Sequence, residues 1–242
     1  MMNVSIIVPV YNEEDNIIPL ARELAGVSGR IPGLEVIFVD DGSTDGTWKA
    51  IAEAGAALAC VRGIRCARNR GQSSAMLAGL QNAEGDVMVT IDGDRQNNPS
   101  DIPQLVEALK DCDVVCGYRA KRRDSWGRRV GSRLANTVRA WFTQDGIRDT
   151  GCSLKAFKRE CVEDLPPFKG VHRFMPAYFR LNGRKIMEVP VDHRPRVAGT
   201  SKYTNLKRLP ATVFDLVGFA WYRRRYQRRL AGPDLSRTES KR

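Results

Sequence analysis

VMVTIDGDRQNNP (residues 87–99) joins a β-type apolar run to a polar loop with two carboxylates two positions apart. Asp92 and Asp94 follow the run Val87–Ile91 directly, and Gln96 lies two residues further on. Oxygen ligands at the carboxyl end of a parallel strand suit a divalent cation that holds a diphosphate. A polar turn after a buried strand is the simpler alternative, because D-G and N-P dipeptides mark turns.

Two earlier segments, VSIIVPVYNEEDN (4–16) and VIFVDDGSTDGT (36–47), repeat this pattern of an apolar run that ends in carboxylates or turn residues. In a parallel sheet the three polar clusters would meet at one edge, which favours a metal site at 92–96 over a simple turn. Mg²⁺ or Mn²⁺ is the expected ion, because the candidate ligands are oxygens and no His or Cys cluster indicates zinc.

The first half of the chain alternates β-rich runs with helical patterns. This order predicts an α/β fold whose mostly parallel sheet is covered by helices on both faces. The predicted strands are 4–9, 35–40, 61–66, 87–91 and 113–117. The predicted helices are 14–25, 46–57, 71–81 and 101–109. After Gly117 the alternation stops, and the remaining expected elements are a basic helix over 126–142, a helix over 171–181 and a strand over 185–192.

Length and cysteine content set further limits. The 242 residues suffice for one α/β domain with a small appendage. The six cysteines form no C-x-x-C pair and no signal peptide precedes the first strand, so we expect reduced thiols in the cytoplasm. The two histidines, His172 and His193, match no metal or nucleophile pattern, and we expect structural or surface roles for both.

The net charge of +11 is concentrated in two basic blocks, residues 119–139 and 207–229. Such clusters suit phosphate groups on a nucleotide, an anionic lipid surface or a nucleic acid. A nucleic acid is not an expected partner, because the chain has no RRM, KH or zinc-finger signature and its basic blocks lack the interleaved aromatic residues of a stacking platform. A sugar nucleotidyltransferase is also disfavoured, since Asn12-Glu13-Glu14 stands where its Gly-rich, Lys-bearing loop is expected.

The segments VPVYNEEDN, VDDGSTDGT and IDGDRQNNP, with DTGCSLKAF and GTSKY downstream, resemble the family 2 glycosyltransferases of the GT-A fold. Within that family the chain is most similar to the polyprenyl-phosphate glycosyltransferases, the dolichol-phosphate mannose synthase group. The resemblance covers about residues 3–205 and implies one Rossmann-like GT-A domain, 1–205, with a nucleotide-sugar half (1–118) and an acceptor half (119–205). A basic amphipathic helical extension (206–230) and a disordered tail (231–242) complete the expected organisation.

The resemblance implies a nucleotide-sugar donor, UDP- or GDP-linked. Tyr11 would border the base, and Pro9 and Glu13 would shape the same loop. A carboxylate at the end of the second strand would accept a hydrogen bond from the base. The resemblance favours Asp41 for this role, while the residues alone leave Asp40 open, because neighbours at a strand end point in opposite directions.

The resemblance also assigns roles to the residues of the predicted metal site at 92–96. Asp94 would be the principal metal ligand, with Asp92 and Gln96 as further ligands or as contacts to ribose and water. The ion would neutralise charge on the departing nucleoside diphosphate. Family members often carry Asp-Ala-Asp at this position, so Gly93 is a mild departure, and Arg95 has no assigned role.

The expected acceptor is a polyprenyl (dolichyl or undecaprenyl) phosphate. Its second pKa is about 6, so the ionised phosphate can attack the anomeric carbon with inversion and without a strong general base. Arg119, Arg133 and Lys202 are the candidates for binding this phosphate, and Arg173 is a further candidate for the active-site side of its helix. The alternative acceptor is a hydroxyl of a glycolipid or polysaccharide, for which Asp149 is the candidate base.

The apolar run Leu209–Tyr222 is flanked by basic residues and is shorter than the roughly 20 residues that span a bilayer. One interpretation is an amphipathic helix in the headgroup region of an anionic membrane, and the other is a helix packed on the catalytic core. The first predicts peripheral attachment to the cytoplasmic face of a membrane, and a separate membrane-spanning subunit is compatible with it.

Overall fold

The computed structural model describes residues 2–120, 139, 142–195 and 205–226, with the side chains of the last helix described from Val213 on. Most of the basic helix expected over 126–142 lies outside the described residues, as do the C-terminal tail and the candidate residues Arg133 and Lys202.

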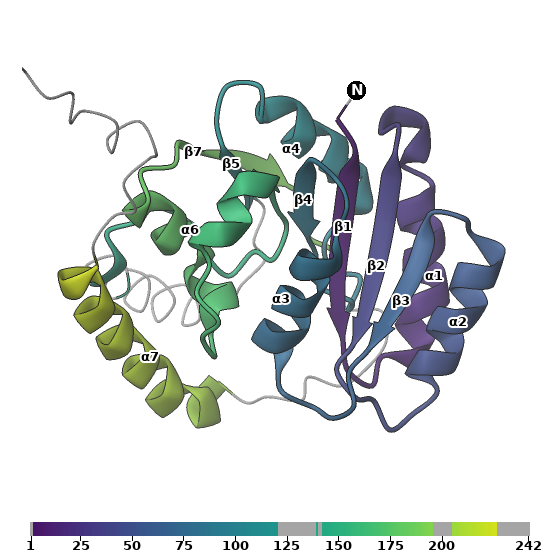
Figure 1. Cartoon of the computed structure of the whole chain (residues 1–242), viewed down its shortest axis with the longest axis horizontal. Helices are drawn as coiled ribbons and strands as arrows, with labels where there is room; N and C mark the ends of the chain where they lie inside the picture. The colour runs from purple at the N-terminus through teal and green to yellow at the C-terminus, as the bar shows by residue number, and fades with distance from the viewer. Residues whose placement is uncertain (1, 121–138, 140–141, 196–204, 227–242) are drawn as a thin grey trace, which may run out of the picture.

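A seven-stranded sheet forms the centre of the fold, in the order β3-β2-β1-β4-β6-β5-β7 (Figure 1). Neighbouring strands are parallel except that β6 runs antiparallel to both β4 and β5. The central strands read as nearly continuous Val and Ile runs because both of their faces are buried. The strands are β1 (Val4–Val10), β2 (Leu34–Asp40), β3 (Val61–Arg65), β4 (Val87–Thr90), β5 (Val114–Arg119), β6 (Lys155–Lys158) and β7 (Ile186–Val191).

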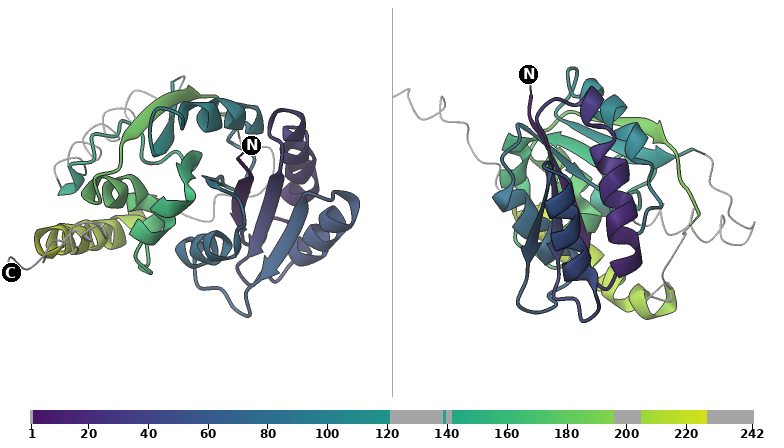
Figure 2. Two further views of the ribbon diagram at one scale, coloured as in Figure 1. Left: turned by 45° about the horizontal axis from the view of Figure 1, so that its top comes forward. Right: turned by 90° about the vertical axis from the view of Figure 1, so that its right-hand side faces the viewer.

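Helices cover both faces of the sheet (Figures 1 and 2). One apolar core lies between the sheet and the helices α1, α2 and α4, and it takes Ile6 and Val8 from β1. The other core lies under α3, α6 and α7 and takes Ile7 from the same strand, as the alternation of side chains along a strand requires. The helices are α1 (Glu14–Ala25), α2 (Thr47–Ala57), α3 (Gln72–Asn82), α4 (Ile102–Ala108), α6 (Val171–Leu181) and α7 (Asn205–Arg225). Three 3-10 turns are η1 (Ser28–Arg30), η2 (Pro99–Asp101) and η3 (Arg159–Asp164).

The C-terminal helix α7 lies beside α6, on the side away from β1–β3 (Figures 1 and 2). The ring of Phe219 stacks on Phe174 of α6 with 5.5 Å between centroids and meets Tyr178 edge-on at 5.1 Å. Of the described helices, none is both long and apolar enough to cross a bilayer. The helix expected from the apolar run 209–222 is therefore present, and one of its faces belongs to the core.

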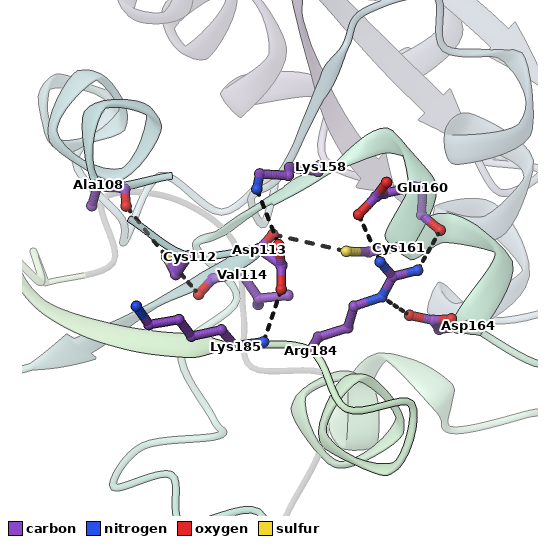
Figure 3. Close-up of polar contacts among 10 residues, drawn as sticks. All are labelled: Ala108, Cys112, Asp113, Val114, Lys158, Glu160, Cys161, Asp164, Arg184 and Lys185. Carbon is purple, nitrogen blue, oxygen red and sulfur yellow. Dashed lines mark hydrogen bonds and ion pairs between the residues drawn. The ribbon is translucent and has the colours of Figure 1, made fainter. Parts of the chain in front are cut away.

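Ion pairs fasten the edge of the sheet at which β5 and β7 begin (Figure 3). Asp113 accepts hydrogen bonds from Lys158 Nζ at 3.0 Å and from the backbone N–H of Lys185 at 2.9 Å. Arg184 pairs with Asp164 at 2.7 Å and with Glu160 at 2.6 Å. These contacts hold β5, β6 and β7 together at one edge of the sheet. The predicted polar clusters lie at the opposite edge, at the carboxyl ends of the parallel strands.

Candidate active site

The loop predicted to bind a metal, residues 92–98 and called the metal loop below, leaves the carboxyl end of β4. Asp92 Oδ1 accepts a hydrogen bond of 2.7 Å from Gln72 Nε2 at the start of α3, and Asp94 Oδ1 accepts one of 3.2 Å from the backbone N–H of Gln96. A Cβ atom at Gly93 would lie 2.5 Å from Val10 Cγ1 of β1, so an alanine at position 93 would clash with this valine and a glycine does not. The departure from Asp-Ala-Asp therefore has a packing reason.

Glu23 of α1 anchors the metal loop from the side. Its carboxylate pairs with Arg95 at 2.6 Å and with Arg194 at 2.6 Å, and the backbone N–H of Arg194 binds the carbonyl oxygen of Gln96 at 2.8 Å. Burial raises the pKa of Glu23, but the hydrogen bonds from the two arginines outweigh it and leave that pKa below its usual value. Arg95, which had no role in the sequence analysis, holds the loop in place.

The environment of Asp92 suits a cation. Burial raises the pKa of the Asp92 carboxyl, and the negative charge of Asp94 raises it further, which outweighs the hydrogen bonds from Ser153 and Gln72. Among the described residues, no group of three or more His, Cys, Asp or Glu side chains could hold a metal. A divalent ion on Asp92 and Asp94 would thus take its other ligands from an amide oxygen, water and phosphate oxygens, as Mg²⁺ commonly does.

The loops after β1 and β2 meet beside the metal loop. The backbone N–H of Asn12 binds Ser43 Oγ at 2.9 Å, and the N–H of Glu13 binds Thr47 Oγ1 at 2.8 Å. These bonds fix the loop that carries Tyr11 and Glu13, whereas Pro9, expected in the same loop, lies within β1 and is in register with Val39 of β2. The sequence analysis assigned all three residues to the nucleotide. The assignment of these three residues stays a prediction.

Asp41 is buried and links this region to α3. Its two carboxylate oxygens accept hydrogen bonds from the backbone N–H groups of Arg70 at 2.9 Å and Gly71 at 2.7 Å. The next residue, Gln72, donates the hydrogen bond to Asp92 described above. Asp40 is also buried, and its Oδ1 accepts the N–H of Ser43 at 2.8 Å. Asp41 thus shapes the turn that carries Gln72, and its proposed contact to the base stays a prediction.

Arg119 and Asp149, which sequence analysis placed in two different mechanisms, are bound to each other. Arg119 Nε and one terminal nitrogen donate to the two Asp149 oxygens at 2.7 Å and 2.8 Å. A Cβ atom at Gly151 would lie 3.0 Å from the guanidinium, so a glycine leaves space for it. A second member of the first basic block, Arg139, pairs with the buried Asp145 at 2.7 Å and has a structural role.

A cavity of about 280 Å³ opens between the metal loop and α6. Lys155 at the start of β6 and His172 at the start of α6 line it, although neither was a predicted site residue. His172 Nδ1 lies 2.6 Å from Ser73 Oγ, a contact that fits the structural role expected for this histidine, and the side chain also lines the cavity. His193 is exposed, in agreement with the expected surface position, and its backbone forms an isolated antiparallel bridge with Asn97. The full lining comprises Gln72, Met76, Thr90, Ile91, Asp92, Thr150, Gly151, Cys152, Ser153, Lys155, His172, Arg173 and Met175.

Residues 5–165 match the family model described as Glycosyl transferase family 2. The undecaprenyl-phosphate 4-deoxy-4-formamido-L-arabinose transferase of Sodalis glossinidius is 37% identical over 88% of this chain, which spans 66% of that protein's length. The dodecaprenyl-phosphate galacturonate synthase of Rhizobium johnstonii is 35% identical over 92% of this chain and 68% of its own length. The matched part of this chain thus spans about two thirds of the length of these relatives.

Among solved structures, glucosyl-3-phosphoglycerate synthase from Mycobacterium tuberculosis, in complex with Mn²⁺, UDP and glucosyl-3-phosphoglycerate, has a similar fold. Its TM-score is 0.70, with 23% sequence identity over 92% of this chain and 80% of that chain. At this identity the likeness concerns the fold. Together with the matched family model, it shows that the chain belongs to glycosyl transferase family 2 and has the GT-A fold.

Proposed function

We propose that this protein transfers a sugar from a UDP- or GDP-linked donor to a polyprenyl phosphate, with inversion at the anomeric carbon. One observation carries the proposal: one carboxylate of the metal loop, Asp92, lines the same cavity as two basic side chains. Asp92 stands on one wall, and Lys155 and Arg173 stand on others. The names of the relatives support the acceptor class, since those proteins act on undecaprenyl and dodecaprenyl phosphate.

The donor would lie along the carboxyl ends of β1, β2 and β4. The loop of Tyr11 and the carboxylate of Asp41 would bind the nucleoside, and Asp92, Asp94 and Gln96 would hold Mg²⁺ or Mn²⁺. The bound ion supplies charge neutralisation for the departing diphosphate. The donor set fits such an ion, because it consists of oxygens and its two carboxylates repel each other in the absence of a cation.

The acceptor phosphate needs cationic positioning and no strong base, because it is largely ionised at neutral pH. Arg119, Arg133 and Lys202 remain the proposed phosphate ligands, of which only Arg119 is a described residue. The pair with Asp149 holds the Arg119 side chain in one orientation at the end of β5.

A hydroxyl acceptor would require Asp149 as general base. Both oxygens of that carboxylate already accept hydrogen bonds from the Arg119 guanidinium. A carboxylate that is held by an arginine at both oxygens is poorly placed to take a proton from a hydroxyl, so the geometry favours the phosphate over the hydroxyl of a glycolipid or polysaccharide.

We infer further that α7 binds a membrane surface from the cytoplasmic side. Leu216 and Phe219 face the core, whereas the exposed apolar side chains on the same helix are Val213, Phe214, Val217 and Trp221. Phe214 is 78% exposed, and three arginines occupy the last turn. This combination suits the headgroup region of an anionic bilayer. The helix would therefore pack on the core and bind the membrane at once, joining the two interpretations of the sequence; a separate membrane-spanning subunit stays a prediction.

The direct test measures transfer of radiolabelled sugar into lipid that can be extracted with organic solvent. A panel of UDP- and GDP-sugars is offered with undecaprenyl or dolichyl phosphate, with and without a chelator of divalent ions. We expect labelled lipid with at least one donor, and only in the assays without the chelator. Absence of labelled lipid with every donor, or label transferred to a hydroxyl-bearing glycolipid instead, would overturn the proposal.

A further inference from the structure

Lys155 is a buried cation in the wall of the cavity. Its side chain is 2% exposed, although lysine is almost never fully buried unless it is paired. The ammonium group donates a hydrogen bond to the carbonyl oxygen of Cys152. Within the described ranges, Lys155 forms no ion pair with a carboxylate. An ammonium group has three N–H donors, so two of them are available to a ligand.

The sheet fixes this lysine in place. β6 lies between β4 and β5, and Lys155 is in register with Thr90 on one side and Cys116 on the other. It lies on the same face of β6 as Phe157, which belongs to the core under α3 and α6. The side chain therefore reaches the cavity from the sheet. A charge held in such a position is costly to bury unless a partner compensates it.

The cavity is too small for a whole nucleotide sugar. Its volume of about 280 Å³ is below the roughly 300 to 1,000 Å³ of sites that enclose drug-sized ligands, and it suits a single sugar ring. Asp92 lies on the wall next to the metal loop, where the diphosphate would end. A sugar attached to that diphosphate would extend from Asp92 toward β6, so it would reach Lys155.

We propose that the sugar of the donor occupies this cavity and that Lys155 determines sugar specificity by donating hydrogen bonds to one of its ring substituents. The inference rests on the proposed function and adds to it a residue that distinguishes one donor sugar from another. A substituent with an accepting oxygen, such as a hydroxyl, formyl or carboxyl group, matches the donors that Lys155 offers. The proposed ligands of the acceptor phosphate are Arg119, Arg133 and Lys202, so binding of that phosphate should not depend on Lys155.

The test compares a nucleotide with its nucleotide sugar. Calorimetry gives the Kd of UDP or GDP, whichever base binds, and the Kd of the corresponding nucleotide sugar, for the wild type and for Lys155→Met. We expect the Kd of the nucleotide to stay within about twofold and the Kd of the nucleotide sugar to rise roughly tenfold or more, because a hydrogen bond to a charged group is lost. The KM for the lipid phosphate should not change. Lys110→Met, the same substitution at an exposed lysine that does not line the cavity, is the matched control.

The opposite results are equally clear. Equal weakening of nucleotide and nucleotide sugar, no change in either, or a rise in the KM of the lipid phosphate alone would overturn the role of Lys155. If Lys155→Met does not fold, deoxy analogues of the donor sugar are tested on the wild type, and one missing hydroxyl should cost about tenfold in binding. A series in which no position costs more than twofold would refute the inference. A wild type that binds no nucleotide sugar contradicts the proposed function itself.

Discussion

The guanidinium group of Arg119 and the carboxylate of Asp149 form a two-pronged ion pair, with N···O distances of 2.7 Å and 2.8 Å, and each side chain is only 15% exposed. Paired geometry of this kind orients both groups and makes the pair stronger than a single surface contact. The two residues therefore act as one unit at the end of β5, and a change in either one alters the other.

Asp149→Asn should lower kcat/KM for the lipid phosphate by about tenfold, because the amide keeps one acceptor while Arg119 loses its counter-charge and its fixed orientation. The shape of the pH–rate profile should not change, since no proton passes through Asp149 when a phosphate is the acceptor. Steady-state kinetics between pH 6 and pH 9 check both points. Loss of the acidic limb of the profile in the variant would instead identify Asp149 as a general base.

Asp94→Ala should remove the metal-dependent part of donor binding. In a thermal-shift panel of UDP- and GDP-sugars, the wild type should be stabilised by its preferred donor only in the presence of Mn²⁺ or Mg²⁺. The variant should lose this stabilisation, and its turnover should fall by at least about 100-fold, since even residues behind a metal ligand cost 10–100-fold. Glu53→Ala, a change on the exposed surface of α2, serves as the control and should behave as the wild type.

Asp92→Asn should stabilise the metal-free protein at neutral pH. The folded state raises the pKa of Asp92 through burial and the charge of Asp94, so it retains a proton that the unfolded chain releases. Stability therefore falls as pH rises from the ordinary pKa of aspartate through the raised one, and it stays lower above that range. Unfolding in urea with a chelator at pH 4 and pH 7.5 should show a gain for the variant only at the higher pH. A gain of equal size at both values would contradict this electrostatic cause.

Replacing Phe214 and Trp221 by serine should weaken binding to vesicles that contain anionic lipid, because these exposed rings would enter the headgroup region. Sedimentation with vesicles at low and moderate salt measures the effect, which should be several-fold. The Kd of the soluble nucleotide should stay unchanged, as α7 is not part of the donor half. Phe168→Ser removes a ring that is 37% exposed outside α7 and should leave vesicle binding intact. Equal loss in the control would mean that the effect is not specific to the helix.

The sequence predicted the fold well where the pattern is local. The bounds of α1 and α6 agree with the expected 14–25 and 171–181, and the polar ends of β1, β2 and β4 lie at one edge of the sheet as expected. These elements were predictable because the apolar pattern of each one lies within a single contiguous segment, and because strands and helices alternate along the chain.

The missed features depend on contacts between distant segments. Thr90 pairs with Lys155, 65 positions later, only because β6 enters the sheet antiparallel between β4 and β5. The ion pair of Arg119 with Asp149 spans 30 positions across a segment outside the described residues. No local pattern shows that a lysine within an apolar strand will face a cavity or that two candidate residues will neutralise each other.

Ser73→Ala should destabilise the protein by about 1–3 kcal/mol, because it removes the acceptor of a buried backbone group. Ser73 Oγ accepts the N–H of Gly170 at 2.9 Å and lies 2.6 Å from His172 Nδ1, so this one hydroxyl joins α3 to the start of α6. The change in the free energy of unfolding is measured in urea. Ser74→Ala, at the neighbouring position of α3, is the matched control and should change stability by no more than about 0.5 kcal/mol. Equal effects of the two variants would show that helix α3, and not the bond to Gly170, responds to the loss of a hydroxyl.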